Sequence, residues 1–323
     1  MKFYYSKKSR SIKVLIISIY ILTLLSACSK HSEDKPDSFI LTGIKSSKGS
    51  ELVTIKLDSG IANTTPIDCY VLGSTVFDSN TNGYGFVDCD SVFQLINPMT
   101  GNLLKSFNLP GYLSQIVIDN NDNTLIGRYT TMIYGEDPDT IETKTIKAGP
   151  PIYTNYVIRV DLETGSVLSK NRVEIGDGIF ACTYFYDQTE KRYFLLRADN
   201  NLISINPSSG EITKTTYIGK SLNNVIYNQS DKTITGITYS AESGKNYIET
   251  YDLTNGSKIT IKELSQIEYY QACISGFDPD LNCYIMINSN LEVLFIDIST
   301  GETLKSSKLD VPLNDLKFWT RHQ

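Results

Sequence analysis

A turn sequence that recurs six times constrains the fold of this chain more than any other feature. Its clearest copy is Asp161-Leu162-Glu163-Thr164-Gly165, in which a β-prone run leads into an aspartate, small polar residues and a glycine. Related sequences end at five further glycines, namely Gly60, Gly101, Gly210, Gly256 and Gly301. This is the composition of a hairpin turn in which glycine takes a positive φ. A repeat of roughly 40–50 residues built from such hairpins is typical of a β-propeller.

A second marker lies upstream of each glycine, where an aromatic residue or isoleucine is followed by Asp or Asn. The pairs are Phe77-Asp78, Ile118-Asp119, Tyr186-Asp187, Tyr227-Asn228 and Phe277-Asp278. The distance from the Asp or Asn to the glycine is 23 residues in repeats two, four and six, 28 in repeat five and 46 in repeat three. Counting 23 residues back from Gly60 makes Asp37 the start of repeat one.

The C-terminal segment supplies a strand that repeat one lacks. Leu313–Trp319 matches Leu113–Asp119 and Leu222–Asn228, which precede the second strands of their repeats. We therefore expect an all-β fold, a six-bladed β-propeller of four-stranded blades, with this strand pairing into the first blade to close the ring. Closure leaves no unpaired sheet edge between the first and last blades. Residues 37–323 are expected to form this single domain.

Residues 1–28 have the pattern of an export signal. Five basic residues precede an apolar run, Val14–Ala27, that is short for a membrane span. Its end, Leu25-Ser26-Ala27-Cys28, resembles the lipobox of bacterial lipoproteins. The resemblance implies cleavage before Cys28, lipidation of Cys28 and anchoring in the bacterial cell envelope, for which we expect the outer membrane. Residues 29–36 are polar and are expected to form a flexible tether. An ordinary signal with an incidental cysteine is the alternative.

The charge balance argues against two classes of partner. Without its leader the chain retains 25 basic and 36 acidic residues, a net charge of −11. Nucleic acids and anionic lipid head groups both require a basic surface. We therefore expect no nucleic acid partner, and membrane contact only through the lipid anchor.

Five cysteines follow the leader: Cys69, Cys89, Cys182, Cys273 and Cys283. An odd number leaves at least one thiol free. Cys182 and Cys273 occupy the same position in repeats four and six, so we expect that they do not pair. Cys273 and Cys283 flank one hairpin turn and could lie close together. We expect all five to be small buried apolar residues.

Variation in repeat length is concentrated on one face of the predicted ring. Label the strands of a blade A to D from the inside outward. Repeat three has 23 extra residues between strands B and C, about 132–154, and repeat five has five near Ala241–Lys245. Two D-to-A connections are longer by four residues, near Gly176–Gly178 and Ile267–Tyr270. All four irregularities emerge on the same face, which we call the variable face. Loops that vary on a constant scaffold commonly form binding sites, although neutral drift in loop length is the alternative.

The variable face supplies ten candidate binding residues of three kinds. Polar residues at the tops of the inner strands could line a central channel that holds either a polar ligand or ordered water. Acidic residues of the connections form a rim, which turn chemistry explains equally well. Loop tyrosines can stack on sugars or anchor a protein. The candidates are Gln115, Asn224 and Asp315; Asp177, Asp199 and Glu242; and Tyr134, Tyr153, Tyr269 and Tyr270.

The sequence gives little indication of catalysis. The two histidines, His31 and His322, lie near the ends of the chain, so we expect no histidine-based or metal chemistry and assign no catalytic residue. Asp119–Asn123 lacks the full spacing of a calcium loop and is interpreted as a turn. A pair of carboxylates could still act in a glycan hydrolase or lyase with its active site in the central channel.

The Asp161–Gly165 unit, followed by Ser166-Val167-Leu168, resembles the repeat of YVTN-type and quinoprotein-like bacterial propellers. The resemblance covers Asp37 to Trp319 and implies the propeller fold. Quinoprotein repeats also carry tryptophans, whereas Trp319 is the single tryptophan here, so we expect no cofactor. The favoured function is a binding or protein-interaction module that contacts an envelope protein or a glycan through the variable face. The 132–154 segment could instead dock on a second copy of this chain.

Overall fold

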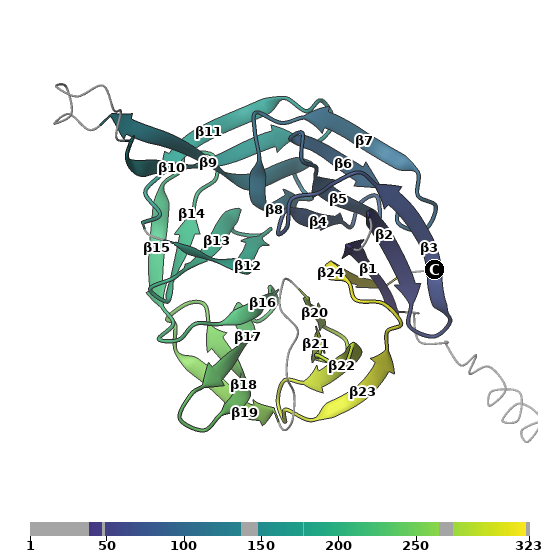
Figure 1. Ribbon diagram of the computed structural model, residues 1–323. Coiled ribbons are helices and arrows are strands. Elements are labelled where there is room, and N and C mark those ends of the chain that lie inside the picture. Colours follow the sequence, from purple (N-terminus) through teal and green to yellow (C-terminus); the bar gives the residue numbers. More distant parts are fainter. Residues whose placement is uncertain (1–38, 47–48, 137–147, 177, 265–273, 321–323) are drawn as a thin grey trace, which may run out of the picture. The chain divides into compact units, whose positions relative to one another are not determined.

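The computed structural model describes residues 39–46, 49–136, 148–176, 178–264 and 274–320. Residues 39–319 form one compact unit. Within it six antiparallel sheets of four strands each are arranged around a central axis as the blades of a β-propeller (Figure 1). The predicted fold class is therefore confirmed. In the described part of the chain, no helix is long and apolar enough to cross a membrane.

Each blade runs from an inner strand A to an outer strand D. Blade 1 consists of β24 (Asn314–Thr320), β1 (Phe39–Ser46), β2 (Ser50–Lys56) and β3 (Gly60–Ile67), and blade 2 of β4 (Thr75–Asp78), β5 (Gly83–Val87), β6 (Val92–Ile96) and β7 (Leu103–Asn108). Blade 3 consists of β8 (Leu113–Asp119), β9 (Thr124–Glu136), β10 (Ala148–Asp161) and β11 (Val167–Val173), and blade 4 of β12 (Ile179–Asp187), β13 (Arg192–Arg197), β14 (Asn201–Ile205) and β15 (Ile212–Tyr217). Blade 5 consists of β16 (Asn223–Asn228), β17 (Thr233–Ser240), β18 (Lys245–Asp252) and β19 (Lys258–Leu264), and blade 6 of β20 (Ser275–Asp278), β21 (Cys283–Ile287), β22 (Glu292–Asp297) and β23 (Thr303–Lys308).

Strands B and C of each blade are apolar on both faces because each sheet is covered on both sides by a neighbouring blade. Between blades 6 and 1, for example, Leu41 and Val53 pack against Ile285 and Phe295, all at most 2% exposed. Comparable apolar clusters fill the other five interfaces in the described part of the ring. The outer strands alternate exposed and half-buried residues because only one of their faces meets another blade.

The ring closes where the sequence predicts. β24, from the end of the chain, is the inner strand of blade 1 and neighbours β1. The Trp319 indole Nε1–H donates to Thr42 Oγ1 at 3.1 Å in the same blade. The Trp319 ring also stacks on Phe77 of blade 2, with ring centroids 5.2 Å apart. The last strand thus joins the first two blades.

Both sequence markers have local structural roles. In the glycine-containing turn, the Asp161 carboxylate accepts backbone N–H groups of Glu163 and Thr164 at 2.9 and 2.7 Å, and Gly165 has φ 70°. The upstream Asp caps the A-to-B turn in the same way: Asp119 Oδ1 accepts from the N–H of Asn121 at 3.1 Å. The Asp119–Asn123 segment is therefore a turn, as predicted. The position predicted for repeat one, Asp37, lies outside the described residues.

The blades alternate between two types, which the sequence analysis did not anticipate. In blades 2, 4 and 6, a fully buried tyrosine of strand B donates to a backbone carbonyl of the preceding blade at 2.6 Å; the pairs are Tyr84 with Asp315, Tyr193 with Gln115, and Tyr284 with Asn224. The three acceptor residues have φ between 50° and 56°. A positive φ is unfavourable for residues other than glycine. It turns the backbone carbonyl of the residue away from its strand, and the tyrosine hydroxyl supplies the hydrogen bond that this carbonyl needs.

Blades 1, 3 and 5 carry a glycine in strand B where the other blades carry a larger residue. A Cβ at Gly127 would lie 2.9 Å from Ile116 Cγ2, and one at Gly43 would lie 2.7 Å from Leu316 Cδ2. The bulged inner strand therefore approaches its neighbour too closely for a side chain. The ring is a threefold repeat of a two-blade unit.

The insertion in blade 3 is a paired ribbon and not an irregular loop. β9 and β10 have 13 and 14 residues and extend well beyond the edge of the ring (Figure 1). Their register pairs Thr131 with Thr154 and Met132 with Tyr153. We call the part of this ribbon beyond the Thr131–Thr154 pair the arm. The tip of the arm, residues 137–147, lies outside the described residues.

Candidate functional site

A cavity of about 580 Å³ opens on the variable face at the base of the arm. Three segments line it: β9 contributes Arg128 and Thr130, β10 contributes Tyr153 to Asn155, and the end of β11 with the β11–β12 connection contributes Arg172 to Gly176 and Gly178. Two of the four length irregularities, the long ribbon and the long β11–β12 connection, therefore meet at one hollow. A volume of this size is in the range of small-molecule sites.

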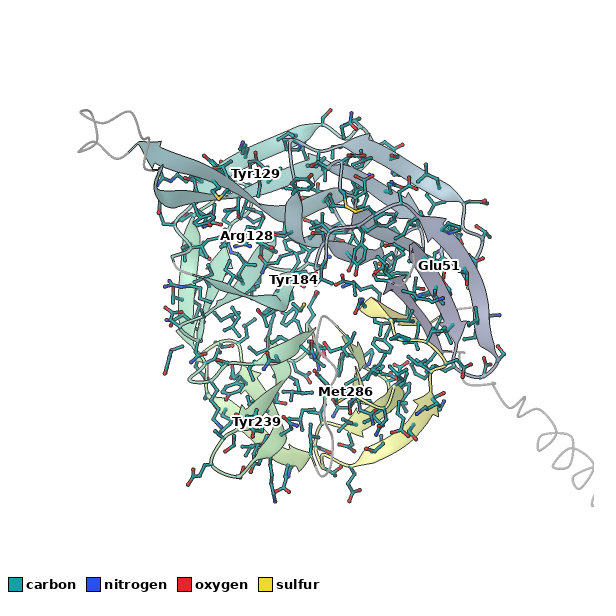
Figure 2. All side chains as sticks on the ribbon, viewed as in Figure 1. Glu51, Arg128, Tyr129, Tyr184, Tyr239 and Met286 are labelled. Carbon is teal, nitrogen blue, oxygen red and sulfur yellow. A yellow bond between two sulfur atoms is a disulfide. The ribbon has the colours of Figure 1, made fainter. Side chains whose placement is uncertain are left out.

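Arg128 and Asn155 form the inner wall of the cavity. Asn155 Oδ1 accepts from Thr130 Oγ1 at 2.9 Å and from Arg128 Nη1 at 3.5 Å. The amide oxygen of Asn155 therefore has two donors, and Asn155 lines the cavity. The Nε–H of Arg128 is buried without a hydrogen-bond acceptor. Figure 2 shows Arg128 on the side of the ribbon's base that faces blade 4. Burial lowers the pKa of its guanidinium, which nonetheless stays protonated.

The outer wall contains a second arginine that already has a partner. Arg172 Nη2 lies 2.8 Å from Glu174 Oε1, and both side chains are mostly exposed. Behind the connection, Arg197 Nη2 lies 2.8 Å from Asp199 Oδ2. A Cβ at Gly176 would lie 3.0 Å from Arg197 Nη2, so Gly176 fits closely over this ion pair. Among the described residues, Arg128 is thus the cavity arginine without an ion-pair partner.

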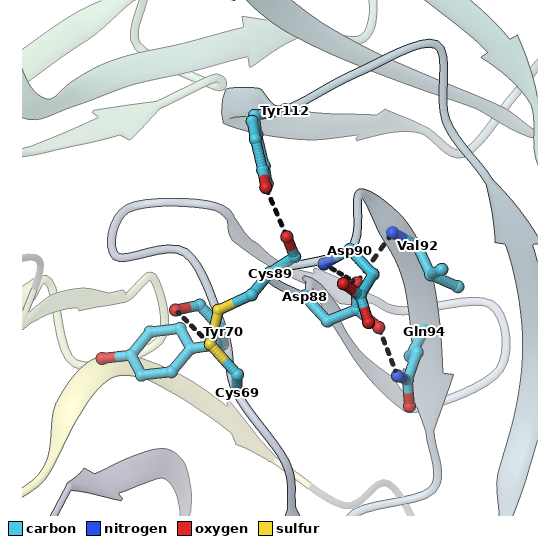
Figure 3. The surroundings of a disulfide bond; sticks show 8 residues. All are labelled: Cys69, Tyr70, Asp88, Cys89, Asp90, Val92, Gln94 and Tyr112. Carbon is cyan, nitrogen blue, oxygen red and sulfur yellow. Dashed lines mark hydrogen bonds between the residues drawn. A yellow bond between two sulfur atoms is a disulfide. The ribbon is translucent and has the colours of Figure 1, made fainter.

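A disulfide fixes another part of the variable face. Cys69, in the β3–β4 connection, is bonded to Cys89, in the β5–β6 turn, with the two Cα atoms 5.7 Å apart (Figure 3). The hydroxyl of Tyr112 donates to the Cys89 carbonyl and brings the β7–β8 connection to the same place. Three consecutive connections of this face are thereby joined.

The expectation that all five cysteines are buried apolar residues is wrong for three of them. Cys69 and Cys89 lie in half-buried and exposed connections between strands, where a side chain has no core to enter. Cys182 is half-buried and is also disulfide-bonded. The expectation is confirmed for Cys283, which is buried as a free thiol. The two predictions that involve Cys273 fall outside the described residues.

The three candidates at the tops of the inner strands are buried within the ring. Gln115, Asn224 and Asp315 are 5%, 5% and 0% exposed, and their carbonyls accept the tyrosine hydroxyls described above. The Asp315 carboxylate accepts the N–H of Gly73 through Oδ2 at 3.0 Å, whereas its Oδ1 has no hydrogen-bond partner in the described part. None of the three lines the cavity at the base of the arm.

Charges and phenols gather around Asp315. Burial raises the pKa of the Asp315 carboxyl, and the positive charge of Lys317 and the Gly73 hydrogen bond only partly oppose it. Burial, with a contribution from the Asp315 charge, raises the pKa of Tyr70 to about 12. Tyr184 reaches from blade 4 toward blade 2, where its hydroxyl lies 3.5 Å from the Thr75 carbonyl oxygen (Figure 2 labels Tyr184). The inner strands are therefore held together by polar contacts across the axis.

The remaining candidates are distributed along the rim. Tyr153 lines the cavity and is 60% exposed. Asp199 lies behind it as the partner of Arg197. Glu242 is exposed on the tight β17–β18 turn, on another blade. The backbone of Tyr134 belongs to the arm and pairs with Pro151. Asp177, Tyr269 and Tyr270 lie outside the described residues.

The carboxylates of Glu174 and Glu249 are held in ion pairs or hydrogen bonds. The cavity is lined by one carboxylate in the described part, Glu174, and Arg172 neutralises it. In blade 5 the buried Glu249 accepts from Thr238 at 2.8 Å and from Lys220 at 3.0 Å, which are structural contacts. A glycosidase mechanism requires two carboxyl groups about 5–9 Å apart. The described lining of the cavity does not contain such a pair.

Arg128, Thr130, Asn155 and Arg172 are not among the binding residues predicted from the sequence. A signal for Arg128 exists, since a charged residue directly follows the apolar run Leu125-Ile126-Gly127. That signal does not say which other segments face the arginine.

Comparisons with known proteins support the fold alone. No protein-family model matches the chain. No curated protein matches it either. Among solved structures, a protein of unknown function from Bacteroides caccae aligns with a TM-score of 0.59 and 12% identity, over 88% of this chain and all of that one. The C-terminal WD40 domain of Sif2 aligns with a TM-score of 0.45 and 13% identity, over 78% of this chain and 63% of that one. This chain is thus similar in fold to the first.

Proposed function

We propose that the protein is a lipid-anchored binding module of the bacterial cell envelope that captures its partner through the variable face. The observation that carries the proposal is the meeting of the arm with a polar cavity at its base. Neutral drift in loop length does not explain why the insertion continues two strands in register. It also does not explain why charged side chains line the cavity at the base of these strands.

The leader sequence supports the anchoring. The Leu25-Ser26-Ala27-Cys28 motif after a basic and apolar segment favours lipidation of Cys28. Several acyl chains, at about 0.8 kcal/mol per buried CH₂, hold a protein durably on a membrane. We place the protein on the outer membrane, with residues 29–36 as the tether. The repeat sequence resembles that of YVTN-type and quinoprotein-like propellers, and we propose that the chain is related to them.

The arm supports contact with a large partner. Beyond Asn155, β10 has no described partner other than β9, and β9 pairs with β8 only as far as Tyr129. Both outer edges of the ribbon therefore carry unpaired backbone groups in the described part of the arm, and such edges recruit further chains. Met132 and Tyr153, a cross-strand pair, are 48% and 60% exposed. The partner is an envelope protein or a glycan that the arm and cavity hold together.

The test is a comparison of two trimmed hairpins in a pull-down from detergent-solubilised envelope. In the arm variant, Asn-Gly replaces residues 133–152, which keeps the Met132–Tyr153 pair and every lining residue of the cavity. In the matched control, Asn-Gly replaces Ala241–Gly244 between the paired Ser240 and Lys245. We expect a partner that is retained by the intact chain and the control and lost by the arm variant. Equal capture by all three would contradict the proposal.

A further inference from the structure

The strongest unassigned feature is the chemistry of the cavity at the base of the arm. Its inner wall presents hydrogen-bond donors. Arg128 and Asn155 both line the cavity, and the oxygen of the Asn155 amide already accepts from Thr130 and Arg128. A wall of donors is complementary to a ligand that is rich in acceptors.

The positive charge of the cavity wall further restricts the class of ligand that fits. Arg128 is half-buried and, among the described residues, no carboxylate lies within ion-pair distance of it. Partly desolvated guanidinium groups are usually paired, because burying an uncompensated charge is costly. The planar guanidinium matches a carboxylate, with which it forms two parallel hydrogen bonds. A bound carboxylate would supply the missing counter-charge.

The other lining groups suit a sugar ring. Tyr153 lines the cavity and is 60% exposed, so its ring can pack against a sugar face. Thr130 and Asn155 offer a hydroxyl and an amide beside Arg128, and such groups bind sugar hydroxyls. The volume of about 580 Å³ accommodates one or two sugar units.

We propose that this cavity binds an acidic saccharide, with Arg128 on the carboxylate of a uronic acid, Asn155 and Thr130 on neighbouring hydroxyls, and Tyr153 against the ring. The inference rests on the proposed function and deepens it, because it identifies the class of ligand that the variable face recognises.

The first test compares two ligands of the same shape. Trigalacturonate and its methyl ester carry the same rings, but the ester has no negative charge. We expect calorimetric titration of the detergent-solubilised full chain to show binding of trigalacturonate, at least tenfold weaker binding of the ester, and a loss of affinity with added salt. Equal binding of acid and ester, or binding of neither, would overturn the proposal without any variant.

The second test assigns the effect to Arg128. Arg128→Met should weaken binding of trigalacturonate at least tenfold and leave binding of the ester unchanged, and Arg128→Lys should be intermediate because it keeps the charge but not the paired geometry. Arg192→Met is the matched control, since Arg192 is a half-buried arginine in the next blade that does not line this cavity. Binding by Arg128→Met that equals the unmodified chain would overturn the assignment.

The two proposals fail separately. Failure to bind uronates leaves the arm-dependent capture of a partner standing. Conversely, an arm variant that binds trigalacturonate normally but captures the same envelope partners as the intact chain would contradict the proposed function and leave the saccharide site standing.

Discussion

The hydroxyl of Tyr84 donates to the backbone carbonyl of Asp315 at 2.6 Å, across 231 positions of sequence. Tyr84 belongs to strand B of blade 2, and Asp315 to the inner strand that closes blade 1. The same contact recurs at Tyr193 and Tyr284, so one hydrogen bond per two-blade unit connects the inner strands to the next blade. The propeller is therefore held by polar contacts at its centre as well as by apolar packing between blades.

Replacing Tyr84 with phenylalanine tests the value of this contact. Tyr84→Phe leaves the Asp315 carbonyl buried without its donor, so we expect a loss of about 1–2 kcal/mol in the free energy of unfolding. Denaturant titration measures the change. Tyr239→Phe is the control, since Tyr239 is 61% exposed and its change should be negligible. Equal stability of Tyr84→Phe and the unmodified chain would show that the hydroxyl contributes nothing to closure.

The Asp315 carboxyl predicts a dependence of stability on pH. Burial raises its pKa in the folded state, with Lys317 opposing. The stability that it contributes is fully present below the unfolded pKa of about 3.9 and is lost as the pH rises through the folded pKa. Asp315→Asn removes this loss. The difference in unfolding free energy between variant and unmodified chain should therefore shift in favour of the variant as the pH rises above about 4.

Denaturant titrations over a pH series check this prediction, with Asp310→Asn at an exposed carboxyl as the control. A difference that is independent of pH, or that shifts in favour of the unmodified chain as the pH rises, would refute the role of Asp315.

Asp187 predicts the opposite dependence on pH. Its buried carboxylate accepts from Tyr227 Oη and from Lys232 Nζ, both at 2.6 Å. Burial alone would raise the pKa of Asp187, but these hydrogen bonds outweigh it and lower the pKa. The contribution is present above the unfolded pKa and is lost as the pH falls through the folded pKa. Lys232→Met should lower the free energy of unfolding by about 1–2 kcal/mol near neutral pH. The loss is smaller than for breaking a fully buried ion pair, because Lys232 is partly exposed.

The cost of Lys232→Met should shrink below about pH 4 as Asp187 is protonated. Lys191→Met, which breaks the exposed pair with Asp122, is the control and should change stability less. A cost that persists unchanged in acid would mean that Lys232 acts through packing of its stem and not through the charge of Asp187.

The Cys69–Cys89 disulfide closes a loop with a sequence separation of 20. Replacing both cysteines with serine should lower the free energy of unfolding by about 3 kcal/mol, the value expected from loop-closure entropy for a loop of this length. Thermal or denaturant unfolding measures the loss. The buried Cys283 thiol provides a second readout, because a thiol reagent should label it faster in the double variant if unfolding has become easier. Unchanged unfolding would contradict a stabilising role.

The blade count, the order of strands and the closing strand could be predicted because each has a local signal. Asp161 and Gly165 specify a turn through contacts within five residues. The bond from the glycine N–H to the carbonyl four residues earlier recurs at Gly101, Gly210, Gly256 and Gly301. Leu313–Trp319 can be recognised as an inner strand because its sequence resembles those of other inner strands. Local hydrogen bonding needs no knowledge of distant residues, so the sequence determined the propeller and the face on which its irregularities fall.

The cavity was decided by tertiary structure alone. Arg128 and Asn155 lie 27 residues apart and meet because the ribbon pairs Thr130 with Asn155. Gly176 joins them only because blade 4 packs against blade 3 at that connection. Tertiary structure also decided the Cys69–Cys89 disulfide. It decided the burial of Gln115, Asn224 and Asp315 as well, because each of these residues contacts a tyrosine of the next blade. A turn is fixed by neighbours in sequence, whereas a binding site depends on which side chains the packed blades bring within hydrogen-bond distance.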